Sequence, residues 1–259
     1  MPGSGSRRDL RRALEVRAGA PYLFPIVLTL LALAAGWWLK DAAPALQGAV
    51  AAPDQQVRKA LSDLTSARLE DVYGHGAGGL AELQELRFGD VTVTVGGEGE
   101  AARARVVAMA EGSGRLAWRG QVIGLGYVGR EAFTMRPCRF AGWCAEGEAL
   151  GELRPVLRLL FRRLDAFNGR DAAAYGRLVA EGYRGEGGKP AVLARLARDL
   201  SAQPPATLAV TAWQVRVVGD EATVGADERL TLGSAPPVPL RTRLRLVREG
   251  GRWVVAEGL

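Results

Sequence analysis

The chain has 259 residues, of which 48% are hydrophobic and 24% are charged, proportions that are normal for globular domains. The net charge of +6 is unevenly distributed. Residues 1–40 hold six basic and two acidic side chains, whereas residues 41–259 hold 28 basic and 26 acidic side chains. Affinity for nucleic acid comes mainly from clustered positive charge that releases phosphate counterions. The balanced body therefore argues against DNA or RNA as a partner.

The N-terminal region contains an uncharged, largely apolar segment over residues 20–39. About 20 helical residues cross a ~30 Å hydrocarbon core, so we predict a transmembrane helix over residues 20–40. Pro21 suits its first turn, and Trp37 and Trp38 lie where interfacial aromatic side chains are expected.

The charge distribution around this segment predicts its orientation. Five arginines precede it and one lysine follows it, which places the Arg-rich tail of residues 1–19 in the cytoplasm. Residues 41–52 have no periodicity and are predicted to be a linker on the far side of the membrane. We therefore expect a bacterial inner-membrane protein with most of its chain in the periplasm.

A cleaved signal peptide is the alternative interpretation of the N-terminus. Ala32-Leu33-Ala34 and Ala43-Pro44-Ala45 resemble small-residue cleavage sites after a basic region. However, the apolar stretch is longer than the usual core of about 7–15 residues in a signal peptide. Its two terminal tryptophans also favour a retained anchor.

The chain has two cysteines, Cys138 and Cys144, with five residues between them. In an exported protein this spacing predicts an intrachain disulfide that closes a small loop; two separate buried thiols are the alternative. Two sulfurs and the single histidine, His75, cannot complete a four-ligand zinc site without carboxylates that nothing in the sequence singles out. We predict no metal and no cofactor.

Residues 53–150 are predicted to form a first α+β module. The apolar spacing of residues 57–64 predicts a helix, and Leu80, Leu83 and Leu86 predict a second, short one. From residue 91 onward the apolar period changes to two, which indicates long strands.

Two glycine-containing segments of the first module are predicted to be hairpin turns. They are Gly96-Gly97 and Gly112-Ser113-Gly114, which lie between the alternating runs. The first module is therefore expected to place helices before an antiparallel meander.

Residues 151–259 are predicted to form a second α+β module with the same order. An apolar stripe predicts its first helix, with Arg158, Arg162 and Arg163 largely off the stripe. The stripe consists of Val156, Leu157, Leu160, Phe161 and Leu164. Two further helical segments and an antiparallel meander follow, so the fold class is α+β, with helices packed on a curved antiparallel sheet.

The second module resembles the NTF2-like superfamily, also called SnoaL-like or cystatin-like, over residues 153–259. The markers are Asp171 and Tyr175 after Phe167-Asn168, and a closing Gly-Arg-Trp-Val-Val strand. Residues 53–145 look like a second, abbreviated copy. The resemblance implies a cone between sheet and helices that often holds a pocket. Because this fold hosts isomerases, dehydratases, cargo binders and assembly proteins, it does not decide function.

One carboxylate is a candidate catalytic group in that cone. Strand alternation places Glu228 on the apolar face, where it could act as a base with Tyr175 or Tyr183 as hydrogen-bond donor. The alternative is a β-bulge that turns Glu228 outward to pair with an arginine such as Arg243.

A basic stripe is the candidate partner-facing surface. Arg241, Arg243 and Arg245 alternate with less polar residues and therefore share one sheet face. Such a stripe is either a solvated face or a docking site for an acidic partner.

Two hypotheses for function follow. In the first, the chain is a membrane-anchored periplasmic scaffold or accessory subunit that contacts the lipid bilayer and other subunits of an inner-membrane complex. A similar architecture occurs in the bitopic channel components of type IV secretion systems. In the second, the cone binds a small molecule or acts as an isomerase-like enzyme. A cone filled by Trp213, Phe161 and Trp253 would leave no room for a substrate.

Overall fold

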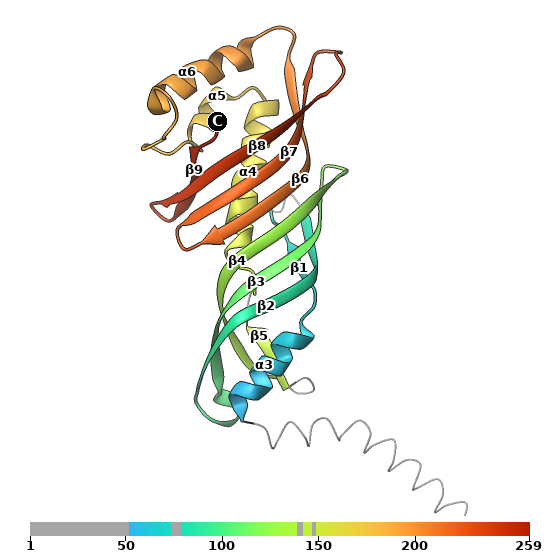
Figure 1. The fold of residues 1–259 in the computed structure, drawn as a ribbon, viewed down its shortest axis with the longest axis vertical. Helices are drawn as coiled ribbons and strands as arrows, with labels where there is room; N and C mark the ends of the chain where they lie inside the picture. Colours follow the sequence, from blue (N-terminus) through green and yellow to red (C-terminus); the bar gives the residue numbers. More distant parts are fainter. Residues whose placement is uncertain (1–51, 74–78, 139–141, 147–148) are drawn as a thin grey trace, which may run out of the picture. The chain divides into compact units, whose positions relative to one another are not determined.

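The structure is a computed structural model that describes residues 52–73, 79–138, 142–146 and 149–259. The predicted tail, the transmembrane helix with Pro21, Trp37 and Trp38, and the linker up to residue 51 lie outside the described residues. No helix within the described ranges is long and apolar enough to cross a membrane. Residues 53–259 form one unit with an α+β fold (Figure 1).

The unit has an N-terminal half, residues 53–146, and a C-terminal half, residues 149–259. The elements of the N-terminal half are α3 (Pro53–Asp63), β1 (Ala67–Glu70), β2 (Leu80–Gly96), the 3-10 turn η1 (Gly99–Ala101), β3 (Arg103–Trp118), β4 (Gln121–Cys138) and β5 (Gly142–Glu146). Those of the C-terminal half are α4 (Leu153–Asn168), α5 (Ala172–Gly176), α6 (Gly188–Ser201), β6 (Ala206–Val218), β7 (Glu221–Leu232), β8 (Val238–Glu249) and β9 (Arg252–Glu257).

The described strands of both halves join one sheet. Its order is β1-β2-β3-β4-β6-β7-β8-β9, with β5 paired to β4. Neighbours are antiparallel except β4 and β6, which run parallel where residues 124–129 pair with residues 212–217. Further along the same edge of β4, residues 134–138 pair with β5. The sheet therefore continues across the boundary at residue 150 that the sequence predicts between two modules.

The predicted second helix at Leu80, Leu83 and Leu86 is wrong, because these residues belong to β2. Leu83 and Leu86 are both buried, and the pairing of β2 with β3 changes register between them, where Glu85 has a φ of 53°. This β-bulge adds one residue, so both leucines face the core with a spacing that imitates a helix. The structure does not confirm a second NTF2-like copy in the first module.

The predicted turn at residues 112–114 is also wrong, because this segment lies inside β3. A Cβ on Gly114 would lie 1.8 Å from the carbonyl oxygen of Glu82 in β2, so the glycine allows a close approach of two backbones. The predicted turn at Gly96-Gly97 is confirmed, since β2 ends at Gly96 and Gly97 has a φ of 77°.

α3 packs on the part of the sheet that belongs to the N-terminal half. Val57 and Leu61 on one face of α3 are buried in a small core with residues of β3, β4 and β5. The indole N–H of Trp143 in β5 donates to Gln56 in α3 over 3.3 Å. The predicted disulfide is confirmed: Cys138 in β4 is bonded to Cys144 in β5.

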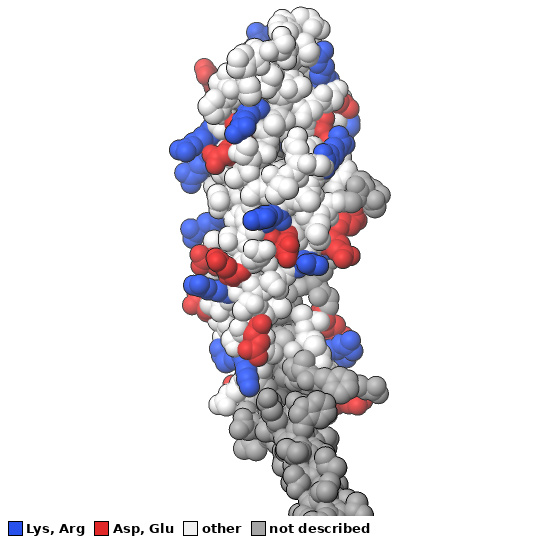
Figure 2. Space-filling view, turned by 90° about the vertical axis from the view of Figure 1, so that its right-hand side faces the viewer, with Lys and Arg blue, Asp and Glu red and all other residues white. Residues whose placement is uncertain are grey.

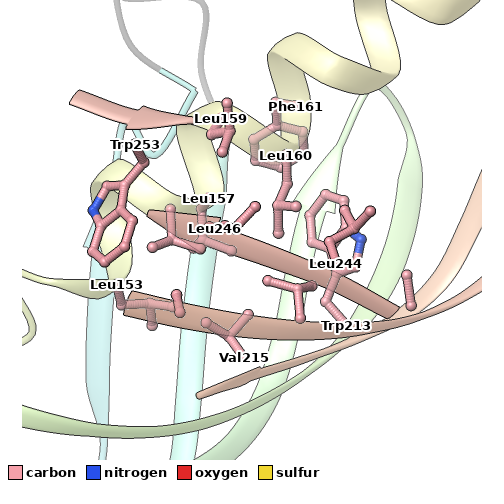
Figure 3. Packing of buried hydrophobic residues seen from close by; sticks show 14 of the residues in the cluster. Leu153, Leu157, Leu159, Leu160, Phe161, Trp213, Val215, Leu244, Leu246 and Trp253 are labelled. Carbon is pink, nitrogen blue, oxygen red and sulfur yellow. The ribbon is translucent and has the colours of Figure 1, made fainter. Parts of the chain in front are cut away.

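α4 supplies the centre of the main core (Figure 3). Phe161 is fully buried, and its ring centroid lies 5.2 Å from that of Trp213 in β6 and 5.3 Å from that of Trp118 in β3. The main core therefore includes side chains from both halves. The predicted apolar stripe of α4 is confirmed, but Arg163 is only 7% exposed and lies on the buried face, contrary to the sequence interpretation.

A buried carboxyl ties the start of α4 to β4. Glu131 in β4 is 1% exposed and accepts a hydrogen bond from the Tyr127 hydroxyl through Oε1. Its Oε2 accepts from the backbone N–H of Glu152, the residue before α4, over 3.4 Å. The Glu152 side chain does not cap the helix and instead pairs with Arg248. Glu131 thus satisfies a backbone donor that the helix start leaves open.

Burial should make Glu131 a pH-dependent element of stability. Burial raises the pKa of the Glu131 carboxyl more than its hydrogen bonds to Tyr127 and to the backbone lower it. A carboxyl with a raised pKa in the folded state stabilises the fold fully below its unfolded pKa, and loses that contribution as the pH rises through the folded pKa.

We predict that wild type loses stability relative to Glu131→Gln as the pH rises from about 4.3, the ordinary glutamate pKa, toward neutrality. Urea unfolding of both proteins over this pH range measures the difference between their free energies of unfolding. The contributions of the other titrating groups are the same in both proteins and cancel in this difference. A difference that stays constant or grows in favour of the wild type would contradict the prediction.

Candidate functional site

The candidate base, Glu228, lies on the inner face of β7 as strand alternation predicts. It is 3% exposed, whereas its neighbour Asp227 faces outward and lies 3.4 Å from Arg241. The alternative, in which a bulge turns Glu228 outward toward Arg243, is therefore wrong. The register shift in this region lies in the partner strand β6, between Val210 and Ala212.

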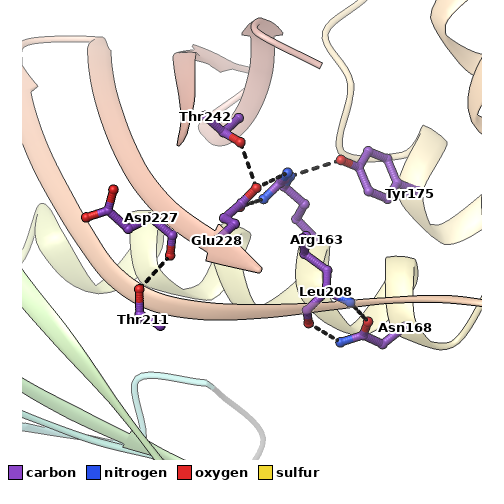
Figure 4. Close-up of polar contacts among 8 residues, drawn as sticks. All are labelled: Arg163, Asn168, Tyr175, Leu208, Thr211, Asp227, Glu228 and Thr242. Atoms are coloured by element: carbon purple, nitrogen blue, oxygen red, sulfur yellow. Dashed lines mark hydrogen bonds and ion pairs between the residues drawn. The ribbon is translucent and has the colours of Figure 1, made fainter. Parts of the chain in front are cut away.

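Glu228 is tied to a buried arginine rather than free to accept a proton from a ligand (Figure 4). Nη1 of Arg163 lies 2.6 Å from Oε1 of Glu228, and Nη2 lies 3.5 Å from Oε2. The Thr242 hydroxyl in β8 donates to Oε2 over 2.7 Å. The carboxylate thus links α4 to β7 and β8, and its oxygens are engaged by donors of the protein itself.

The two tyrosines proposed as donors are held elsewhere. The Tyr175 hydroxyl accepts a hydrogen bond from Nε of Arg163 over 2.9 Å, and it is Arg163 that lies between Tyr175 and Glu228. Burial raises the pKa of Tyr175, although Arg163 opposes this shift. The Tyr183 hydroxyl contacts the backbone of Leu259, donating to its oxygen over 3.1 Å and accepting from its N–H over 2.9 Å. The structure joins Glu228 and Tyr175 in one cluster but not Tyr183.

Arg163 is the member of this cluster that the sequence interpretation missed. It follows Val156 by seven residues and Leu160 by three, spacings that place it on the buried face of the helix. The sequence interpretation had placed it largely off the apolar stripe, with Arg158 and Arg162. The sequence does contain a signal for a buried ion pair. It is the combination of a basic residue on the apolar stripe, Arg163, with an acidic residue at an inward strand position, Glu228.

Two of the residues on which the family resemblance rests, Asn168 and Asp171, stabilise the local structure. The Asn168 amide donates to the carbonyl oxygen of Leu208 over 2.9 Å and accepts from its N–H over 2.7 Å. This part of β6 lies before the segment, residues 212–217, that pairs with β4. Asp171 caps α5 by accepting from the N–H of Ala174 over 2.7 Å. These contacts fix the end of α4 and the start of α5.

The inside of the C-terminal half is packed with large side chains. Phe161, Trp213 and Trp253, the three that the sequence analysis named, are 0%, 1% and 6% exposed. The rings of Phe161 and Trp213 meet edge to face at 75°. Glu228 therefore lies beside a filled core.

A large open groove lies elsewhere, between α4, α5 and the hairpin of β8 and β9. It has a volume of about 1490 Å³, and we name it the α4–β9 groove. Its lining includes Arg158, Arg162, Arg177, Arg252 and Trp253, and it does not include Glu228, Tyr175 or Tyr183. The sequence interpretation missed this surface, because its residues come from segments far apart in the chain, from Tyr73 to Val254.

The predicted basic stripe on β8 is partly neutralised. Arg241 pairs with Asp227, and Arg245 pairs with Glu221, whereas Arg243 forms no ion pair within the described part of the chain. Basic and acidic side chains are interspersed over the face that Figure 2 shows. The role of Arg241, Arg243 and Arg245 in docking stays a prediction.

No protein-family model matches the sequence, and no curated protein matches it. The similar solved structures include an NTF2-like protein from Pseudomonas putida KT2440, with 20% identity and a TM-score of 0.37 over 40% of this chain and 80% of that one. Another is a protein with a cystatin-like fold from Nostoc punctiforme PCC 73102, with 15% identity and a TM-score of 0.37 over 43% and 90%.

A third is an NTF-2 like protein from Shewanella oneidensis MR-1, with 15% identity and a TM-score of 0.35 over 41% of this chain and 95% of that one. The names of these three proteins describe an NTF2-like protein or a cystatin-like fold. A likeness of this extent carries no conclusion about activity or partners.

The buried ion pair predicts a large difference between neighbouring carboxylates. Glu228→Ala should lower the free energy of unfolding by about 3–5 kcal/mol, because it leaves the Arg163 charge buried without its partner. Asp227→Ala, on the same strand but in an exposed pair, should cost about 1 kcal/mol or less. Urea unfolding of the three proteins checks this.

A double variant separates the ion pair from other effects at the site. Replacing both partners, Arg163→Met with Glu228→Leu, should be less destabilising than Glu228→Ala because no uncompensated charge remains. Equal costs for Glu228→Ala and Asp227→Ala would contradict the structural role of Glu228.

Proposed function

We propose that the protein is a membrane-anchored scaffold or accessory subunit, which holds partner subunits of an inner-membrane complex with the surface of a periplasmic body. The observation that carries the proposal is the filled interior: Phe161 and Trp213 are buried at the place where a cone pocket would open, and Glu228 is bound to Arg163. Such a body has its binding capacity on its surface rather than inside.

Two further features support this role. The uncharged run of residues 20–39 is long enough to anchor the chain in a bilayer. The disulfide between Cys138 and Cys144 agrees with an oxidising compartment such as the periplasm.

The isomerase-like alternative has less support. An isomerase needs a general base that can reach a substrate proton. The Glu228 oxygens accept hydrogen bonds from Arg163 and Thr242, and the α4–β9 groove does not include Glu228.

Topology is the first test. In spheroplasts, protease added from outside should remove a C-terminal tag and leave an N-terminal tag intact, and carbonate washing should leave the protein in the membrane. Leu30→Arg with Leu31→Arg should abolish this behaviour, because each arginine costs about 2.5–3.5 kcal/mol at the centre of a membrane helix. Leu30→Ala with Leu31→Ala is the matched control. A protease-resistant C-terminal tag in wild type would contradict the proposal.

Assembly is the second test. After extraction in mild non-ionic detergent and native separation, the full chain should migrate together with other membrane proteins, which mass spectrometry identifies. The same bands should be absent when the Leu30→Arg, Leu31→Arg variant is extracted. Migration of the wild type as a lone monomer in several detergents would contradict a scaffold.

A further inference from the structure

The α4–β9 groove combines an apolar floor with an arginine-rich rim. Leu159, Val179 and Trp253 in its lining are 5%, 3% and 6% exposed, which makes the floor largely hydrophobic. Arg158 and Arg162 lie on the α4 side, one helical turn apart, and Arg252 lies on the β9 side. The basic side chains therefore come from two opposite walls.

The acidic residues of the groove are already engaged by the protein. Asp165 pairs with Arg119 over 3.2 Å, and Glu181 pairs with Lys189 over 2.7 Å. Asp171 caps α5, and Glu249 accepts from the backbone N–H of Glu181 over 3.3 Å. Each carboxylate in the lining thus has an intramolecular partner.

The arginines of the groove differ from these acids. The side chains of Arg158, Arg162, Arg177 and Arg252 make no hydrogen bond or ion pair with any residue in the described part of the chain. The guanidinium fork is a strong donor to carboxylates, often through two parallel hydrogen bonds. Four such groups around one groove are available to an acidic ligand.

Three buried polar atoms of the lining residues lack a partner as well. They are two donors, Nε of Arg158 and the indole Nε1 of Trp253, and one acceptor, Oδ2 of Asp165; all three are buried without a hydrogen bond among the described residues. A polypeptide backbone offers a carbonyl acceptor and an N–H donor to match them, whereas an inorganic anion offers acceptors alone.

Size also indicates a polypeptide. Small-molecule sites usually enclose about 300–1,000 Å³, and the α4–β9 groove is larger and open. We propose that this groove binds an extended acidic segment of a partner protein, with its carboxylates on the arginine rim and its apolar side chains on the floor. This inference deepens the proposed scaffold function by naming the binding face.

A peptide titration tests the inference. The probe is a fluorescein-labelled peptide about ten residues long, roughly 33 Å when extended, in which Asp and Glu alternate with Leu and Val. The matched peptide carries Asn and Gln in place of the acids. Fluorescence anisotropy is measured with the purified full chain in non-ionic detergent, at low and at raised salt.

The acidic peptide should bind saturably, more weakly at raised salt, and the neutral peptide roughly tenfold more weakly or not at all. Arg162→Gln and Arg252→Gln, both at exposed positions, should each weaken binding roughly fivefold, and the double variant should weaken it further. Arg216→Gln, at an exposed position of β6 outside the groove, is the matched control and should leave binding unchanged.

Three results would overturn the inference: no binding of the acidic peptide, equal binding of both peptides, or an equal loss in Arg216→Gln. The last would mean a general charge effect rather than a built groove. Because this titration uses purified protein and requires no membrane orientation, its failure is distinguishable from a failure of the topology or assembly tests.

Discussion

The packing of Phe161 at the centre of α4 is the contact on which the rest of the structure depends. Its ring meets Trp213 from the C-terminal half, and Trp118 and Tyr73 from the N-terminal half. Among the described strands, the short parallel pairing of β4 with β6 is the one ladder that joins the two groups of strands. Burial of large aromatic side chains contributes strongly to stability, so α4 gives both halves a common core.

Polar contacts fix α4 at both ends of this core. At its start, Glu131 in β4 accepts from the backbone N–H of Glu152. Toward its end, Arg163 pairs with Glu228 in β7, and Asn168 binds the backbone of Leu208 in β6. Buried polar groups that are fully satisfied restrict a core to one arrangement. The buried charged residues Glu131, Arg163 and Glu228 therefore each have partners within the fold.

Much of the C-terminal half could be predicted from the sequence because each signal there is local. The stripe of α4 and the inward position of Glu228 follow from spacing alone. In the N-terminal half, the disulfide between Cys138 and Cys144 also follows from a local spacing. The N-terminal half was harder to predict, because the bulge at Glu85 gives Leu83 and Leu86 a helical spacing within a strand.

The candidate site shows the same limit. The partner of Glu228 is 65 positions away, and the inward position of Arg163 is visible only if a charged residue is allowed on a buried stripe. The α4–β9 groove depends on how α4, α5 and β9 come together, which no sequence spacing encodes. The contacts that could not be predicted from the sequence are therefore those between residues far apart in the chain.

Native-state hydrogen exchange of the full chain with Phe161→Ala tests the shared core most directly. Removing this ring should cost about 3–5 kcal/mol. If α4 serves both halves, the most protected backbone amides of β3 and β4 and those of β6 and β7 should lose protection by the same free energy. Loss of protection confined to β6 and β7, with β3 and β4 unchanged, would contradict a common core.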